Sequence, residues 1–142
     1  MIGASILQPV AILAAWTMVM WCWMMAKRLP AGGGGKVDQE KVRQSGPAIL
    51  DELLPPEAQR VAHNYNHLHE APTVFYALSL LLALVGAGDG ISAQLAWGYV
   101  ALRVLHSVVH ATANIIMLRF AIFALSTFVL MGLVAIAVQA VF

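Results

Sequence analysis

The chain has 142 residues, of which 61% are hydrophobic and 11% are charged, and its net charge is +1. A soluble domain carries about 25% charged and roughly 45–50% apolar residues, so this composition predicts a single domain of a membrane protein. The near-neutral charge provides no basic surface for nucleic acid, and we expect no nucleic-acid partner.

The first predicted helix covers residues 2–29. Met1–Ala26 contains no charged side chain and is followed by Lys27 and Arg28. This stretch is long enough to cross a hydrocarbon core of ~30 Å. Glycine, proline and charged residues dominate the next segment, which predicts a polar cytoplasmic connection over residues 30–55.

Three further helices are predicted in the rest of the chain. Pro55 and Pro56 suit the first turn of a helix, and we expect one continuous helix over 56–86. The sequence "GAGDG" indicates a turn before a third helix over 91–114, and a fourth is expected over 116–141. The short connections predict an all-α, up-down-up-down bundle of four transmembrane helices.

The positive charges predict the orientation of this bundle. Six of them flank the first connection: Lys27, Arg28, Lys36, Lys41, Arg43 and Arg60. The second connection has only Asp89, and Arg119 stands beside the third. Because lysine and arginine favour the cytoplasmic side, we expect the first and third connections in the cytoplasm and both termini outside it.

Polar residues at helical spacing form one stripe on each of the two middle helices. The first stripe is His63, Asn66, His67 and Glu70, and the second is Arg103, His106 and His110. Asn64 and His69 fall outside the first stripe and are expected at the membrane interface. The residues of the two stripes either form structural hydrogen bonds between helices or form a ligand-binding or catalytic site.

Arg103 lies about 18 Å from the outer end of its helix at 1.5 Å per residue, well inside the membrane. A charged side chain at that depth usually faces an oppositely charged or hydrogen-bonding partner, or a water-filled cavity. Glu70 is the only acidic side chain in the interior of a predicted span, so we expect Arg103 and Glu70 in one buried polar cluster. The two residues can come from the same chain or from neighbouring chains.

Three motifs resemble the MAPEG family, the membrane-associated proteins of eicosanoid and glutathione metabolism. They are "RVAHNYNHLHEAPTVFYA" over 60–77, "LRVLHSVVH" over 102–110 and "LRF" over 118–120. The match covers the last three predicted helices and is similar to a bacterial branch, which implies a bacterial inner-membrane protein. The resemblance also implies a homotrimer, with three glutathione sites formed between neighbouring subunits.

The resemblance assigns roles residue by residue. Five positions keep the family's pattern: Arg60, Glu70, Arg103, His106 and Arg119. Three imidazoles depart from it, because His63, His67 and His110 replace a family arginine, asparagine and tyrosine. Asn66 stands one position from the family's asparagine. The resemblance implies that Arg119 holds the glutathione thiolate as the catalytic residue, and that the other eight residues bind glutathione.

Three functions remain open at this stage. The first is a glutathione-dependent transferase or peroxidase that acts on lipophilic electrophiles, with glutathione as co-substrate. The second is a non-catalytic trimer that binds lipids or partners, because imidazoles at ligand positions suit a repurposed site. The third is a metal site, because His63, His67, Glu70, His106 and His110 offer imidazole and carboxylate ligands.

Overall fold

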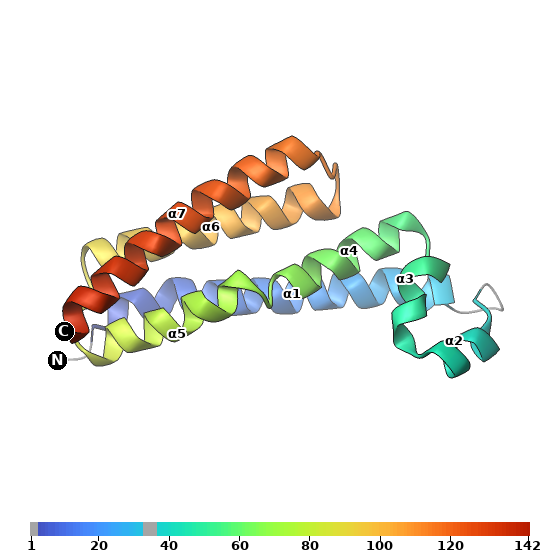
Figure 1. Cartoon of the computed structure of the whole chain (residues 1–142), viewed down its shortest axis with the longest axis horizontal. Coiled ribbons are helices and arrows are strands. Elements are labelled where there is room, and N and C mark those ends of the chain that lie inside the picture. Colours follow the sequence, from blue (N-terminus) through green and yellow to red (C-terminus); the bar gives the residue numbers. More distant parts are fainter. Residues whose placement is uncertain (1–2, 33–36) are drawn as a thin grey trace.

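The computed structural model describes residues 3–32 and 37–142, and every regular element in these two ranges is helical. The elements in chain order are η1 Ala4–Ile6, α1 Leu7–Gly32, α2 Gln39–Ser45, η2 Pro47–Ile49, α3 Leu50–Leu53, α4 Pro56–His67, α5 Ala71–Leu84, α6 Ile91–Ala111 and α7 Ile116–Val141. The long helices form an elongated bundle (Figure 1), with α1 beside α4 and α5 and with α6 beside α7. The predicted all-α fold is confirmed.

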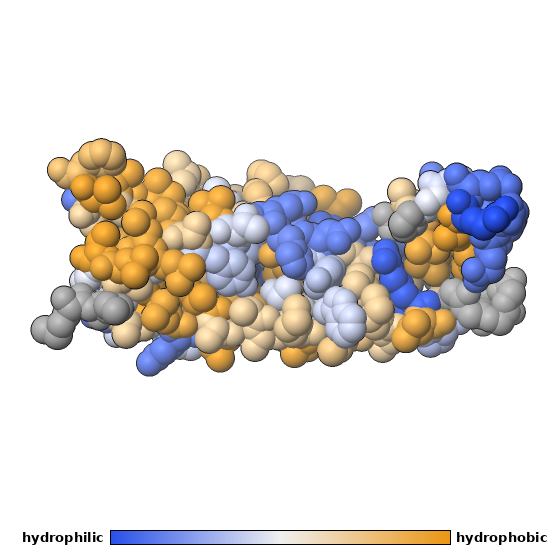
Figure 2. Space-filling model, turned by 90° about the horizontal axis from the view of Figure 1, so that it is seen from below, coloured by the Kyte–Doolittle hydropathy of each residue, from blue (hydrophilic) through white to orange (hydrophobic). Residues whose placement is uncertain are grey.

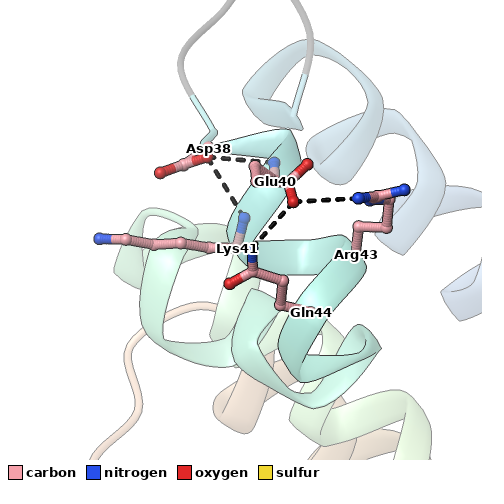
Figure 3. A network of polar contacts seen from close by, with 5 residues as sticks. All are labelled: Asp38, Glu40, Lys41, Arg43 and Gln44. Atoms are coloured by element: carbon pink, nitrogen blue, oxygen red, sulfur yellow. Dashed lines mark hydrogen bonds and ion pairs between the residues drawn. The ribbon is translucent and has the colours of Figure 1, made fainter.

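The long segment predicted between the first two spans contains helices of its own. Asp38 caps α2 by accepting hydrogen bonds from the amides of Glu40 at 3.1 Å and Lys41 at 3.3 Å (Figure 3). The carboxylate of Glu40 accepts from Arg43 at 3.2 Å and from Gln44 at 2.8 Å. A small apolar cluster supports this segment; it contains Val37, Leu54 and Ala58, with Ala31, Val42, Leu50 and Leu53 packed against them.

The helix predicted over 56–86 is divided into α4 and α5. Pro72 has no N–H, so the carbonyl of Leu68 cannot receive its helical hydrogen bond. The last turn of α4 tightens before this point: the amide of His69 donates to Asn66 and that of Glu70 donates to His67. Helix α5 then starts at Ala71, with Pro72 in its first turn. The polar stripe therefore ends in a bend rather than continuing along one straight helix.

The amino-terminal end of the chain is fastened to the α5–α6 connection. The amide of Gly3 donates to the carbonyl of Ala83 at 2.9 Å, and the amide of Ser5 donates to Oδ1 of Asp89 at 3.0 Å. A Cβ atom on Gly3 or on Gly88 would collide with the backbone of the other residue. Only glycine permits the two segments to cross at this distance.

Helices α6 and α7 pack along each other. Small buried side chains, Ser107 on α6 and Ser126 on α7, lie inside the bundle, as is usual where membrane helices approach closely. Asn114 occupies the connection with a φ of 52°, a left-handed conformation that asparagine tolerates better than most residues.

The surface divides along the long axis of the molecule. Figure 2 shows an apolar half near the chain termini and a polar band towards the end that carries α2 and α3. In the described part of the chain, two segments, Ala4–Ala31 and Ile116–Val141, are long and apolar enough to cross a membrane. The other long helices, α4 to α6, are shorter than these two segments or carry polar residues.

Candidate functional site: a histidine and arginine pocket

A pocket of about 430 Å³ opens between the end of α4, the carboxyl-terminal part of α6 and the start of α7. Its lining combines three ionisable residues with three apolar ones: His67, His106, Arg119, Ile116, Phe120 and Phe123. The structure therefore brings together three of the residues that the sequence predicted for a site. They come from three different helices.

Two imidazoles line this pocket, and that of His110 lies beside them. The ring centroid of His67 lies 5.0 Å from that of His106 and 6.1 Å from that of His110, and the two α6 rings lie 5.8 Å apart. The ring of Phe123 packs 5.7 Å from His67 and closes one side. His106 and His110 are buried, whereas His67 is partly open at the pocket. The two predicted stripes do meet, and they meet through their histidines.

Glu70 binds His67 directly. Nδ1 of His67 lies 2.6 Å from a carboxylate oxygen of Glu70, across the bend that follows α4. The side chain of Glu70 is 66% exposed, and that of His67 is 21% exposed. The carboxylate thus fixes the imidazole through one nitrogen and leaves the other nitrogen available to a ligand.

Arg119 is held at the pocket by the turn before α7. Its Nη1 donates to the side-chain Oδ1 of Asn114 at 2.5 Å. Arg119 is half-buried beside Ile116 and Phe120. The guanidinium consequently places a permanent positive charge against an apolar wall.

Arg103 lies behind this wall rather than in the pocket. It is 1% exposed, and its Cζ lies 5.2 Å from the centroid of the Tyr99 ring and 5.1 Å from that of Phe123. None of its three guanidinium nitrogens has a hydrogen-bond partner in the described part of the chain. Two aromatic faces therefore stabilise the buried charge. Glu70, its expected partner, bonds His67 instead within this chain.

Three other predicted ligands stand outside the pocket in the single chain. His63 and Asn66 are exposed on α4, and Arg60 is half-buried on the same helix. These side chains lie on a face from which a second molecule could reach them.

Sequence reasoning missed two features of this region. Asn64, expected at the membrane interface, is 1% exposed and donates to Oγ of Ser107 at 2.6 Å. Its spacing from Val61 and Leu68, both buried, was the available signal. The apolar wall was also missed, although Ile116, Phe120 and Phe123 lie on one face of α7 together with Arg119.

The donor set does not form a metal centre in the described residues. No group of three or more His, Cys, Asp or Glu side chains there has a geometry that could hold a metal ion. The three imidazoles contact one another as rings, and the nearby Arg103 and Arg119 would repel a cation.

Comparison with known proteins identifies the family. The family model for the MAPEG family matches residues 6–139 of this chain. Neither the curated proteins nor the solved structures contain a match. Because the family match extends over nearly the whole chain, this protein belongs to the MAPEG family and is a membrane protein.

Proposed function

We propose that the protein is a glutathione-dependent transferase or peroxidase that acts on lipophilic electrophiles. One observation supports this most directly: the pocket places the cation of Arg119 beside an apolar wall of Ile116, Phe120 and Phe123. The cation would stabilise the glutathione thiolate, and the apolar wall would bind the lipophilic electrophile.

The chemistry of glutathione suits the residues around the pocket. The free thiol has a pKa of ~8.5, so most of it is protonated at neutral pH, and a neighbouring cation favours the reactive thiolate. Glutathione also carries two carboxylates, which arginines bind through charge-assisted hydrogen bonds. In this proposal Arg119 faces the sulfur, and Arg60 and Arg103 supply positive charge for the carboxylates. The polar side chains of His63, Asn66, His67, Glu70, His106 and His110 complete the binding site.

The proposed assembly is a homotrimer with sites between subunits. One feature supports it: the exposed polar face of α4 with His63 and Asn66, which a neighbouring chain would cover. Mass measurement of the detergent-solubilised protein tests this; a monomer at all concentrations would contradict it.

We also propose that the chain crosses the bacterial inner membrane four times with both termini outside the cytoplasm. In this arrangement α4 and α5 form one span with a bend, and α6 forms another between α5 and α7. The lysines and arginines around α2 and α3 support a cytoplasmic position for that end. Periplasmic and cytoplasmic reporters fused to the carboxyl terminus test the orientation, and a reporter active only in the cytoplasm would contradict it.

Turnover tests the proposed activity. The purified protein is assayed with glutathione and a panel of aryl halides, conjugate acceptors and lipid hydroperoxides. Arg119→Ala should lower the rate by about 100-fold, as loss of a group that stabilises a reacting anion does. Arg43→Ala is the matched control, because Arg43 is an exposed arginine on α2. Equal rates for the wild type and Arg119→Ala would overturn the proposal.

A second candidate is a lipid-binding trimer without turnover. The first turn of α7 favours it, since Ile116 and Met117 are 73% and 77% exposed beside the pocket. Such a surface suits an acyl chain as well as an electrophile. Mass spectrometry of the gently purified protein distinguishes the two candidates: a retained lipid with no turnover on any electrophile supports this second function.

A further inference from the structure

We propose that His67 and Glu70 form a general-base pair that removes the proton from the glutathione thiol. This inference rests on the proposed function and adds a catalytic role to a residue assigned only to binding. Three observations support it: the 2.6 Å bond between Nδ1 of His67 and the Glu70 carboxylate, the place of His67 in the pocket lining, and the presence of Arg119 in the same lining.

The geometry matches what a general base requires. An imidazole needs one nitrogen fixed by an acceptor, so that the other nitrogen carries the free lone pair towards the substrate. Glu70 binds Nδ1, and in the described contacts Nε2 of His67 has no hydrogen-bond partner. The bend after α4 is what brings Glu70 back onto His67, because α4 ends at His67 itself.

The proposed step conserves atoms and charge. The S–H bond of glutathione breaks, its proton goes to Nε2 of His67, and the electron pair stays on sulfur. Glu70 stabilises the resulting imidazolium, and Arg119 stabilises the thiolate. With an aryl chloride, sulfur then forms the C–S bond, chloride leaves, and the imidazolium returns its proton to water.

Other titratable and charged groups surround His67 and contribute to any pH dependence. His63 and Glu70 belong to its own segment, α6 presents Arg103, His106 and His110, and α7 presents Arg119. A test must therefore separate the general base from the rest of the cluster. The neighbouring His69 provides a matched control, because it is exposed and its Nδ1 contacts the carbonyl of Tyr65 at 2.9 Å instead.

The test is the pH profile of kcat/KM with glutathione and chlorodinitrobenzene. His67→Gln should lower kcat/KM by about 100-fold near pH 6.5, the usual size of general acid–base catalysis. The loss should shrink to about threefold near pH 9.5, where the thiol ionises without help. His69→Gln should stay within about twofold of the wild type at both pH values. A loss that does not change with pH, or no loss, would overturn the general-base role.

Glu70→Gln gives an independent measurement, and the exposure of Glu70 means that this substitution leaves the core packing intact. It should produce a smaller loss with the same pH dependence, which Glu70→Asp should partly restore. Unchanged pH profiles for both variants would overturn the role of the pair. Calorimetric titration of the wild type with glutathione separates this proposal from the proposed function. If glutathione does not bind, both proposals fail. If it binds but the losses of kcat/KM in the variants do not change with pH, only the general-base role fails.

Discussion

Asn64 on α4 and Trp16 on α1 donate to the same hydroxyl oxygen, that of Ser107 on α6. The distances are 2.6 Å from Nδ2 of Asn64 and 3.0 Å from Nε1 of Trp16. Three helices therefore meet at one buried polar point, and α4 and α6 both continue from it to the pocket. We infer that this contact sets the position of α4 relative to α6, and so the distance between His67 and His106.

Ser107→Ala should destabilise the protein. The substitution leaves the Asn64 amide and the Trp16 N–H without their shared acceptor in a buried region, and an interhelical hydrogen bond in a membrane is worth about 0.6–2 kcal/mol. Thermal unfolding of the detergent-solubilised protein measures the loss. Ser79→Ala is the control, because Ser79 is equally buried but its hydroxyl has no partner in the described residues. Equal melting temperatures for the two variants would contradict the account.

Gly88→Ala and Gly98→Ala should change stability in opposite directions. A Cβ at Gly88 meets the backbone of Gly3 and Ala83, so overpacking should cost about 1–3 kcal/mol. A Cβ at Gly98, inside α6, meets no atom within contact distance, and alanine there should stabilise the helix by about 0.5–1 kcal/mol. Melting temperatures of the two variants test this, and a Gly88→Ala protein as stable as wild type would refute the close crossing.

Asp89 should make stability depend on acidic pH. Hydrogen bonds from the Ser5 hydroxyl and the Ser5 amide hold the pKa of Asp89 below its ordinary value. A group whose folded pKa is lowered stabilises above its unfolded pKa of about 4, and this contribution disappears as pH falls through the lower folded value. Wild type should therefore melt above Asp89→Ala at pH 6, and the gap should close in strong acid. A gap independent of pH would contradict the assignment.

The apolar wall of the pocket should select ligands with a hydrophobic tail. S-hexylglutathione should bind at least tenfold more tightly than glutathione, because each buried methylene is worth about 0.8 kcal/mol. Phe120→Ala should remove much of this preference, since Phe120 lines the pocket. Phe128→Ala is the control, because Phe128 is similarly exposed on α7 but lies outside the lining. A preference unchanged in Phe120→Ala would place the hexyl chain elsewhere.

Much of the fold could be predicted from periodic apolar runs and their breaks. Turn residues led us to predict helices over 91–114 and 116–141, and the structure has α6 over Ile91–Ala111 and α7 over Ile116–Val141. The bend between α4 and α5 was missed although Pro72 stands at it, because the apolar run on its far side resembles a continuous span. Short helices in the first connection were also missed, since α2 depends on a single cap at Asp38.

Local spacing predicted which site residues share a face, but not which faces meet. His67, His106 and Arg119 do converge, as the two stripes and the family pattern suggested. The apolar half of the pocket was not recognised, because α7 is apolar on every side and the face shared with Arg119 does not stand out. The bond between His67 and Glu70 also depends on the bend. His67 is the last residue of α4, and the bend brings Glu70, which lies beyond the helix end, back against it.

Calorimetric titration with glutathione tests the central claim most directly. We predict saturable binding to the wild-type protein, unchanged affinity in Arg43→Ala, and at least a tenfold weaker affinity in Arg119→Ala, equivalent to about 1.4 kcal/mol. Absence of saturable binding to the wild type at millimolar glutathione, or equal affinity in all three proteins, would contradict a glutathione site at this pocket.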